Sequence, residues 1–166
     1  MECSLHLGAH ADAPIHYTAG GDGIGERPLE PYFGPAQLMK VDVGRNERVR
    51  PKHLSGPILA PRLLIGTGTF PDPDQWNADF AGLSAELIDF VAAEGVRLIG
   101  IDTPSVDPQE DRELESHQAI ARHDLSILEG LILNEVAEGV YSLCALPLRI
   151  EGADASPVRA VLLPLS

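Results

Sequence analysis

The stretch HLGAHADAPIH, residues 6–16, gathers side chains that could bind a metal ion. It holds half of the six histidines in the chain together with one carboxylate, and all four lie at even positions: His6, His10, Asp12 and His16. Imidazole and carboxylate ligands together suit Zn²⁺, with Mn²⁺ as an alternative. Polar residues on an exposed strand face, each bonded to water, would give the same composition. The regular spacing of four such residues at even positions favours a metal site over an exposed strand face, so we predict a catalytic metal centre here.

An extended but bent backbone would bring these side chains together. In a helix the four could not share one face, and Gly8 and Pro14 disfavour a helix interior. In an extended chain alternate residues point to one side. A straight strand would separate His6 from His10 by about 13 Å, whereas two ligands of one ion each lie about 2 Å from it. We therefore expect the segment to curve around the ion.

A second candidate group lies more than a hundred residues further along the chain. His117 falls on a predicted helix, and Glu129 interrupts the apolar run 126–133. A carboxylate in apolar surroundings is unfavourable unless it is paired or binds a cation. Glu129 could instead occupy an exposed bend beside Gly130. A buried cation explains the pattern better, and this second group, which also contains His123 and Asp124, could complete the metal centre.

The hydrophobic pattern predicts a single α/β domain in which strands outnumber helices. Its clearest unit is a helix over 83–95, capped by Ser84 and ended by Gly95, followed by a buried strand over 96–102. A second helix is predicted over 110–122. Further strands are predicted over 36–43, 61–69, 140–150 and 157–165. The run 126–133 fits either type of element.

Four other residues have two interpretations each. Asp102 and Thr103 follow a predicted strand, where they could orient a ligand histidine or begin a helix. Trp76, the single tryptophan, could line a pocket, but simple packing is favoured. His123 is more simply explained by the end of its helix than by a metal.

The composition excludes several classes of partner. The net charge is −13 with 12 basic residues, which argues against nucleic acid as a partner. No apolar run is long enough to span a membrane, and no signal peptide is recognisable. The two cysteines, Cys3 and Cys144, form no CxxC motif and suggest no disulfide framework. We expect a cytoplasmic protein that acts on a small molecule.

The motifs resemble those of the bacterial kynurenine formamidases, which are metal-dependent enzymes of the cyclase family. The resemblance rests on HLGAHADAPIHY and GVRLIGIDTPSVDP, and HDLSILEGLIL and ALPLRIEGADASPVRAVL support it. It implies a cyclase-like β/α/β swivelling fold with a mixed central sheet. The implied reaction is hydrolysis of N-formyl-L-kynurenine, an aryl formamide, to L-kynurenine and formate in tryptophan degradation. A homodimer is implied as well.

The resemblance also implies a role for each candidate residue. It places two divalent ions, usually zinc, on five ligands: His6, His10, Asp12, His117 and Glu129. Asp12 would bridge the two ions. His16, at the end of the D-x-P-x-H pattern, would be the proton donor and acceptor rather than a ligand.

One departure from the family pattern concerns the amino terminus. Family members usually carry a longer segment before the histidine motif, with a first strand and an aromatic residue that contacts the substrate. Here Met1 precedes His6 by five residues. We therefore expect one domain over residues 1–166 that lacks this strand and exposes a sheet edge. An isatin-hydrolase-like enzyme that opens a cyclic amide, and an inactive shortened metal-binding paralogue, are the alternatives.

Overall fold

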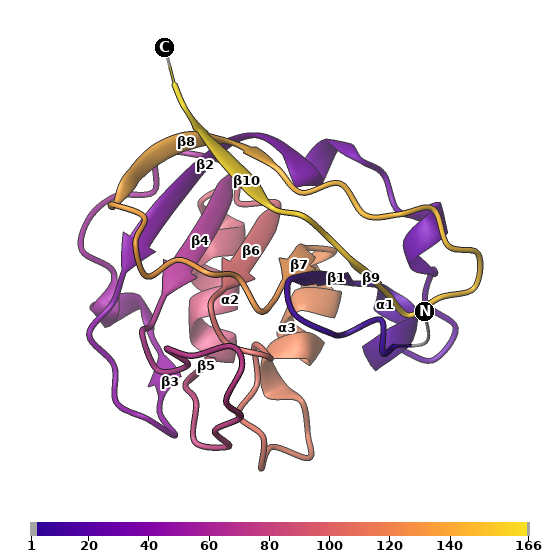
Figure 1. The fold of residues 1–166 in the computed structure, drawn as a ribbon, viewed down its shortest axis with the longest axis horizontal. Helices are drawn as coiled ribbons and strands as arrows, with labels where there is room; N and C mark the ends of the chain where they lie inside the picture. Colours follow the sequence, from indigo (N-terminus) through magenta and orange to yellow (C-terminus); the bar gives the residue numbers. More distant parts are fainter. Residues whose placement is uncertain (1–2, 166) are drawn as a thin grey trace.

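A six-stranded mixed sheet forms the centre of the computed structural model, which describes residues 3–165 (Figure 1). Its strand order is β10-β8-β2-β4-β6-β7. The four strands β2, β4, β6 and β7 are parallel to one another, whereas β8 is antiparallel to both β2 and β10. The strands are β2 (Phe33–Lys40), β4 (Arg62–Gly66), β6 (Leu98–Ile101), β7 (Ser126–Leu128), β8 (Gly139–Cys144) and β10 (Val161–Pro164). The mixed central sheet agrees with the sequence-based expectation.

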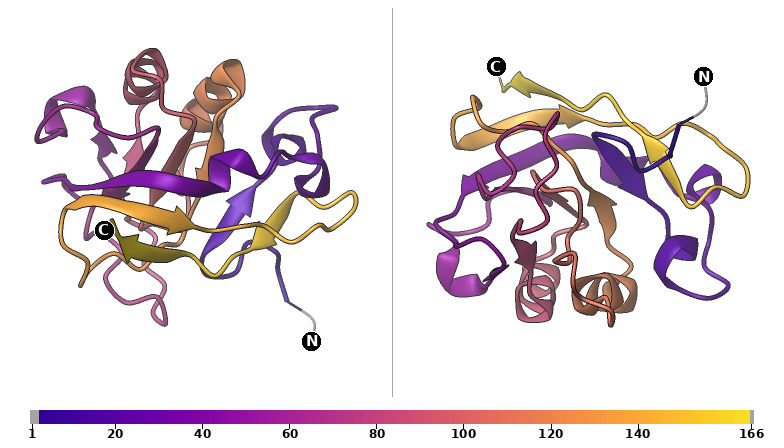
Figure 2. Two further views of the ribbon diagram at one scale, coloured as in Figure 1. Left: turned by 90° about the horizontal axis from the view of Figure 1, so that it is seen from above. Right: turned by 60° about the horizontal axis from the view of Figure 1, so that its bottom comes forward.

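Two helices, α2 (Ala85–Ala93) and α3 (Glu115–His123), cover one face of this sheet. Figure 2 shows both on the same side. Side chains alternate across the sheet: Leu63 and Ile65 of β4 face the helices, whereas Leu64 packs in a second core on the opposite face. Because both faces of the parallel strands are covered, side chains on both sides are buried, and the strand sequences are almost continuously apolar.

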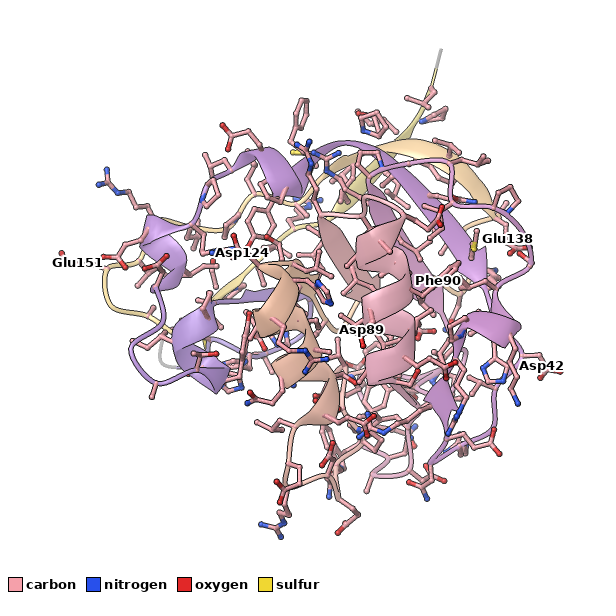
Figure 3. All side chains as sticks on the ribbon, turned by 180° about the vertical axis from the view of Figure 1, so that it is seen from behind. Asp42, Asp89, Phe90, Asp124, Glu138 and Glu151 are labelled. Carbon is pink, nitrogen blue, oxygen red and sulfur yellow. The ribbon has the colours of Figure 1, made fainter. Side chains whose placement is uncertain are left out.

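Polar contacts join the exposed sides of the two helices. Asp89 and Phe90, labelled in Figure 3, lie on the outward side of α2. The carboxylate of Asp89 pairs with Arg122 at 3.2 Å and with His123 at 2.8 Å. His123 therefore contacts a neighbouring helix rather than the metal-ligating candidates.

Smaller elements surround the sheet. β1 (His10–Asp12) pairs antiparallel with β9 (Ala155–Pro157), and β3 (Arg48–Val49) pairs parallel with β5 (Gly82–Leu83). The short helix α1 covers Pro14–Tyr17, and three 3₁₀ turns follow: η1 (Ile24–Glu26), η2 (Glu30–Tyr32) and η3 (Pro51–His53). The pairing of β1 with β9 joins the two ends of the chain beside the sheet.

Most predicted elements are present, with shifted boundaries. Ser84 caps α2 by accepting a hydrogen bond from the Leu87 amide, and Gly95 has a φ of +85° after the helix, as expected. The second helix begins only at Glu115, because the residues before it form turns around Asp111.

Two strand predictions need correction. The strand expected over 140–150 ends at Cys144, shortly before Pro147, which has no amide hydrogen to donate to a ladder. The strand expected over 157–165 is divided, since β9 pairs with β1 and β10 pairs with β8. The ambiguous run 126–133 forms β7 and an irregular segment after Leu128. Among residues 3–165, no helix is long and apolar enough to cross a membrane.

Candidate metal centre

The amino-terminal segment bends as expected, but by two different devices. A turn with Gly8 at a φ of +65° leads into β1, where His10 and Asp12 lie on one side of a short strand. The expectation of an extended chain fails after Ala13. Pro14 begins α1, a position where its missing N–H removes no helical hydrogen bond, and this helix carries His16.

Backbone pairing brings Glu129 to this segment. The His10 amide donates to the Glu129 carbonyl at 3.1 Å, and the Glu129 amide donates to the His10 carbonyl at 3.0 Å. The next residue, Gly130, has a φ of +64°, and a Cβ there would overlap the carbonyl of Gly8. A glycine is therefore required at this position for the two segments to approach.

Imidazoles and carboxylates converge at this contact. His10 Nε2 lies 3.3 Å from Asp12 Oδ1 and 3.1 Å from Glu129 Oε2, and His6 Nδ1 lies 3.1 Å from Asp12 Oδ1. His10, Asp12 and Glu129 are each only 1–2 % exposed. Glu129 is therefore buried, and the exposed-bend alternative is wrong.

His117 reaches the same cluster from α3. Its Nε2 lies 3.4 Å from Asp12 Oδ2 and 3.7 Å from Glu129 Oε1. Its Nδ1 lies 2.8 Å from Asp107 Oδ2, so that carboxylate orients the ring and leaves Nε2 directed at the cluster. The His10 ring is held in the same manner, with Nδ1 2.8 Å from the Gly8 carbonyl. Metal-binding histidines are typically oriented through their second nitrogen in this way.

Sequence reasoning did not single out Asp107, although it lies in the motif GVRLIGIDTPSVDP. It also accepts hydrogen bonds from the Ser116 and His117 amides at the start of α3, and pairs with Arg48 at 2.7 Å. Its carboxylate thus caps the helix that carries His117. The sequence shows only an aspartate ahead of a predicted helix. Its burial and its contact with His117 are visible only in the tertiary structure.

Asp102 and Thr103 do not perform the role considered for them. Asp102 accepts hydrogen bonds from the Thr67 and Gly68 amides and from the Thr67 hydroxyl. Thr103 donates to the Ser105 carbonyl. Neither of these side chains orients a ligand histidine, and no helix begins at Asp102. Asp102 instead stabilises the loop after β4.

The charges in the cluster shift the pKa values of its members strongly. Burial lowers the pKa of His10, but its close contacts with the Asp12 and Glu129 carboxylates overcome this and raise it to about 10. Burial acts likewise on His117, and its contacts with Asp107 and Asp12 raise the pKa to about 10. Burial favours protonation of Asp12, yet hydrogen bonds from the histidines hold its pKa well below the usual range. The buried carboxylates are therefore stable only with a positive charge beside them, from protonated histidines or from a cation.

The residues fit a metal ion. His10 Nε2 and Asp12 Oδ1 are buried atoms without a hydrogen-bond partner among the described residues. Two groups of the described residues bring ligand atoms within 4.8 Å of one another: His6, Asp12 and His16, and His10, Asp12 and Glu129. Asp12 belongs to both groups. Unpartnered, buried nitrogen and oxygen atoms that face a common point are what a divalent cation would satisfy.

His16 lies at the solvent-exposed side of the cluster. Its ring centroid is 4.4 Å from that of His6, and its Nδ1 lies 3.3 Å from Asp154 Oδ2. The same carboxylate oxygen lies 3.3 Å from His6 Nε2. Asp154, just before β9, therefore contacts both rings. It was not identified from the sequence as a site residue.

A cavity opens beside His6. Its volume is about 150 Å³, and its walls include Phe70, Trp76 and Ile132. Trp76 is 65 % exposed and packs edge-on against Phe70 at 5.8 Å. Both interpretations of Trp76 therefore hold, because its ring packs against Phe70 and also lines this cavity. We name the space the aryl cavity.

Replacing Asp107 with asparagine is expected to weaken zinc binding about 10- to 100-fold, because the His117 ring loses the carboxylate that orients it. Zinc titration with a competing chelator measures this. Asp111→Asn is a matched control, since Asp111 also pairs with Arg48 and accepts amide hydrogen bonds before α3 but does not contact His117. Equal losses in the two variants would contradict the assigned role.

Comparison with known proteins identifies the family of this chain. The family model described as Putative cyclase matches residues 1–108. A kynurenine formamidase of Bordetella petrii is 47 % identical over 165 residues, which cover 98 % of this chain and 78 % of that protein.

Solved structures share the fold. One described as a potential metal-dependent hydrolase with cyclase activity has a TM-score of 0.85 at 27 % identity, covering 97 % of this chain and 80 % of that one. Isatin hydrolase A from Labrenzia aggregata has a TM-score of 0.79 at 23 % identity, covering 97 % and 74 %, and shows the fold alone. Because the family model matches more than half of the chain and the B. petrii relative aligns along nearly all of it, this chain belongs to the cyclase family.

Proposed function

We propose that this protein hydrolyses N-formyl-L-kynurenine to L-kynurenine and formate. The near-full-length similarity to a kynurenine formamidase carries the proposal. The geometry supports it, because a buried cluster of imidazoles and carboxylates adjoins a cavity with aromatic walls. A formamide on an aromatic amine would place its ring in that cavity and its amide bond beside His6.

The residues that would hold the metal are the five that meet in this cluster. We propose two zinc ions, with Asp12 as the shared ligand, held by His6, His10, Asp12, His117 and Glu129. When bound, such ions supply Lewis acidity, which lowers the pKa of water and polarises a carbonyl group. The chain itself contributes the fixed orientation of the ligand rings and the buried surroundings.

His16 is the residue proposed to move the proton. Hydrolysis adds water to the formyl carbon, breaks its bond to nitrogen and delivers one proton to the departing aryl amine. The contact of His16 Nδ1 with Asp154 leaves Nε2 for proton transfer. An imidazole can accept a proton from water and return it to the departing amine.

The assay that tests the function follows the release of L-kynurenine and formate from N-formyl-L-kynurenine by the zinc-loaded protein. Isatin serves as the competing substrate, since solved isatin hydrolases share this fold. Hydrolysis of the formamide with little opening of isatin is expected. Preferential opening of isatin would support the cyclic amide hydrolase instead, and zinc binding without any hydrolysis would support an inactive paralogue.

Replacing Trp76 with alanine is expected to raise KM for the formamide about tenfold, because the aryl cavity loses its largest wall. Aromatic packing and the burial of apolar area together account for an effect of this size. Steady-state kinetics on the zinc-loaded variant provide the measurement. Trp76→Phe is the control and retains most of the affinity. An unchanged KM in Trp76→Ala would exclude the ring from substrate binding.

We further propose a homodimer that acts in the cytoplasm, in tryptophan degradation, on a small molecule and not on nucleic acid or membranes. The net charge of −13 supports the absence of a nucleic-acid partner. Light scattering coupled to gel filtration tests the oligomeric state.

A further inference from the structure

We propose that a second cavity, which shares two lining residues with the aryl cavity, binds the amino-acid end of the substrate, with the Lys40 ammonium group pairing with its α-carboxylate. This inference rests on the proposed function, since it concerns the part of N-formyl-L-kynurenine that does not react. That part carries one carboxylate and one ammonium group, and both need partners when the ring is buried.

The two cavities share walls. The second has a volume of about 200 Å³ and is lined by Lys40, Gly66, Gly68, Asp102, Leu133 and Asn134. Asp102 and Asn134 also line the aryl cavity. A molecule whose ring lies against Trp76 can therefore extend past these two residues toward Lys40. We name the second space the lysine cavity.

The position in the fold is one where ligands commonly bind. Lys40 is the last residue of β2, Gly66 is the last residue of β4, and Asp102 directly follows β6. These three strands are parallel neighbours, with Lys40 paired to Gly66. The lysine cavity thus lies at the carboxyl ends of the parallel strands, where open α/β sheets form ligand crevices.

Lys40 is oriented but its charge is uncompensated. Its Nζ donates to the Asn134 carbonyl at 2.9 Å, which leaves two N–H donors. No carboxylate of the described residues lies within 4.0 Å of this nitrogen. The nearby Glu138, labelled in Figure 3, instead accepts a hydrogen bond from the Lys40 backbone amide at 2.9 Å. An exposed ammonium group held at a cavity wall is suited to a ligand carboxylate.

Asn134 and Asp102 line both cavities, and their polar groups contact residues of both. The carbonyl of Asn134 holds Lys40, whereas its side-chain amide donates to the carbonyl of Pro71, which lines the aryl cavity. Asp102 is 5 % exposed, and among residues 3–165 it accepts only from uncharged donors, the amides and hydroxyl of the loop after β4. A buried carboxylate with no cationic partner favours an ammonium group beside it. The ammonium group of the amino-acid end would thus lie beside Asp102, and its carboxylate would lie beside Lys40.

The test compares ligands with and without the amino-acid end. L-kynurenine and 2-aminoacetophenone share the aryl ketone, and only the first carries the amino acid. Their binding to the zinc-loaded protein is measured by calorimetry, and turnover is measured with the N-formyl derivative of each. Lys40→Met is expected to raise Kd for L-kynurenine and KM for its formyl derivative about tenfold. Neither constant should change for the ligands that lack the amino acid.

Lys52→Met is the matched control. Lys52 is the other lysine of the chain, is also exposed, and lines a different cavity with Arg48 and Arg50. The two variants change the net charge equally, so an effect confined to Lys40→Met is local. Lys40→Arg should retain most of the affinity for L-kynurenine.

The outcomes separate the two proposals. Hydrolysis of neither formamide would overturn the proposed function, but a loss of L-kynurenine binding confined to Lys40→Met would still support the lysine cavity. Three results would overturn the proposed role of the lysine cavity. Lys40→Met could affect both ligand pairs equally, it could affect neither pair, or L-kynurenine could fail to bind the native protein.

Discussion

Replacing His16 with alanine is expected to lower kcat about 10²- to 10⁴-fold, the usual contribution of a general acid–base, while zinc content stays unchanged. The reason is positional. His16 lies at the exposed side of the cluster, and the remaining candidate ligands contact one another without it. Kinetics with N-formyl-L-kynurenine and elemental analysis of the purified variant measure the two quantities.

The zinc content decides between two roles of His16. Its ligand atoms lie within 4.8 Å of those of His6 and Asp12, so a metal ligand is the competing role. A variant that loses about one zinc per chain would assign His16 to the metal. A fully loaded and fully active variant would remove both roles. Tyr17→Phe, at the neighbouring position on α1, is the control for disturbance of that helix.

Removing the metal is expected to abolish turnover and to lower Tm, with a larger decrease at alkaline pH. In the metal-free chain the pKa values of His10 and His117 are raised from 6.5 to about 10. Their protonation therefore stabilises the folded state fully below pH 6.5, and this contribution is lost as pH rises through about 10. Bound metal keeps both rings neutral, so the loaded protein lacks this dependence.

Thermal unfolding of the loaded and chelator-treated protein between about pH 7 and about pH 9 measures this difference. The gap in Tm should widen as pH rises, and zinc should restore both Tm and turnover. A gap that narrows with pH would contradict the assignment of these two histidines to the site. Copper or manganese in place of zinc tests the identity of the metal.

Much of the candidate site was predictable because its residues have distinctive types and spacing. His6, His10 and Asp12 form a short motif, and Glu129 is conspicuous as a carboxylate inside an apolar run. The structure places all of them, with His117, in one cluster, in which His6 is half-buried and the others are buried. The parallel core was predictable for a related reason, since strands covered on both faces are uniformly apolar.

Other features depended on contacts between distant residues, which no local pattern records. Asp107 contacts His117 because a turn lies against the start of α3, and Asp154 contacts His16 because β9 pairs with β1. Trp76 lines a cavity because its ring packs against Phe70 and its indole N–H donates to the Gln109 side chain.

For this protein the sequence alone determined the chemistry that is available: which side chains can bind a cation, which segments are apolar enough to form the sheet, and which family they resemble. The tertiary structure alone decided which of those side chains meet, which rings are oriented by a second contact, and where the cavities open. The physical reason is that ligand identity and hydrophobic period are local properties of a chain. Ring orientation and cavity shape depend on how the chain folds in space, which joins Asp107 to His117 and brings Asp12 to His117 from more than a hundred residues away.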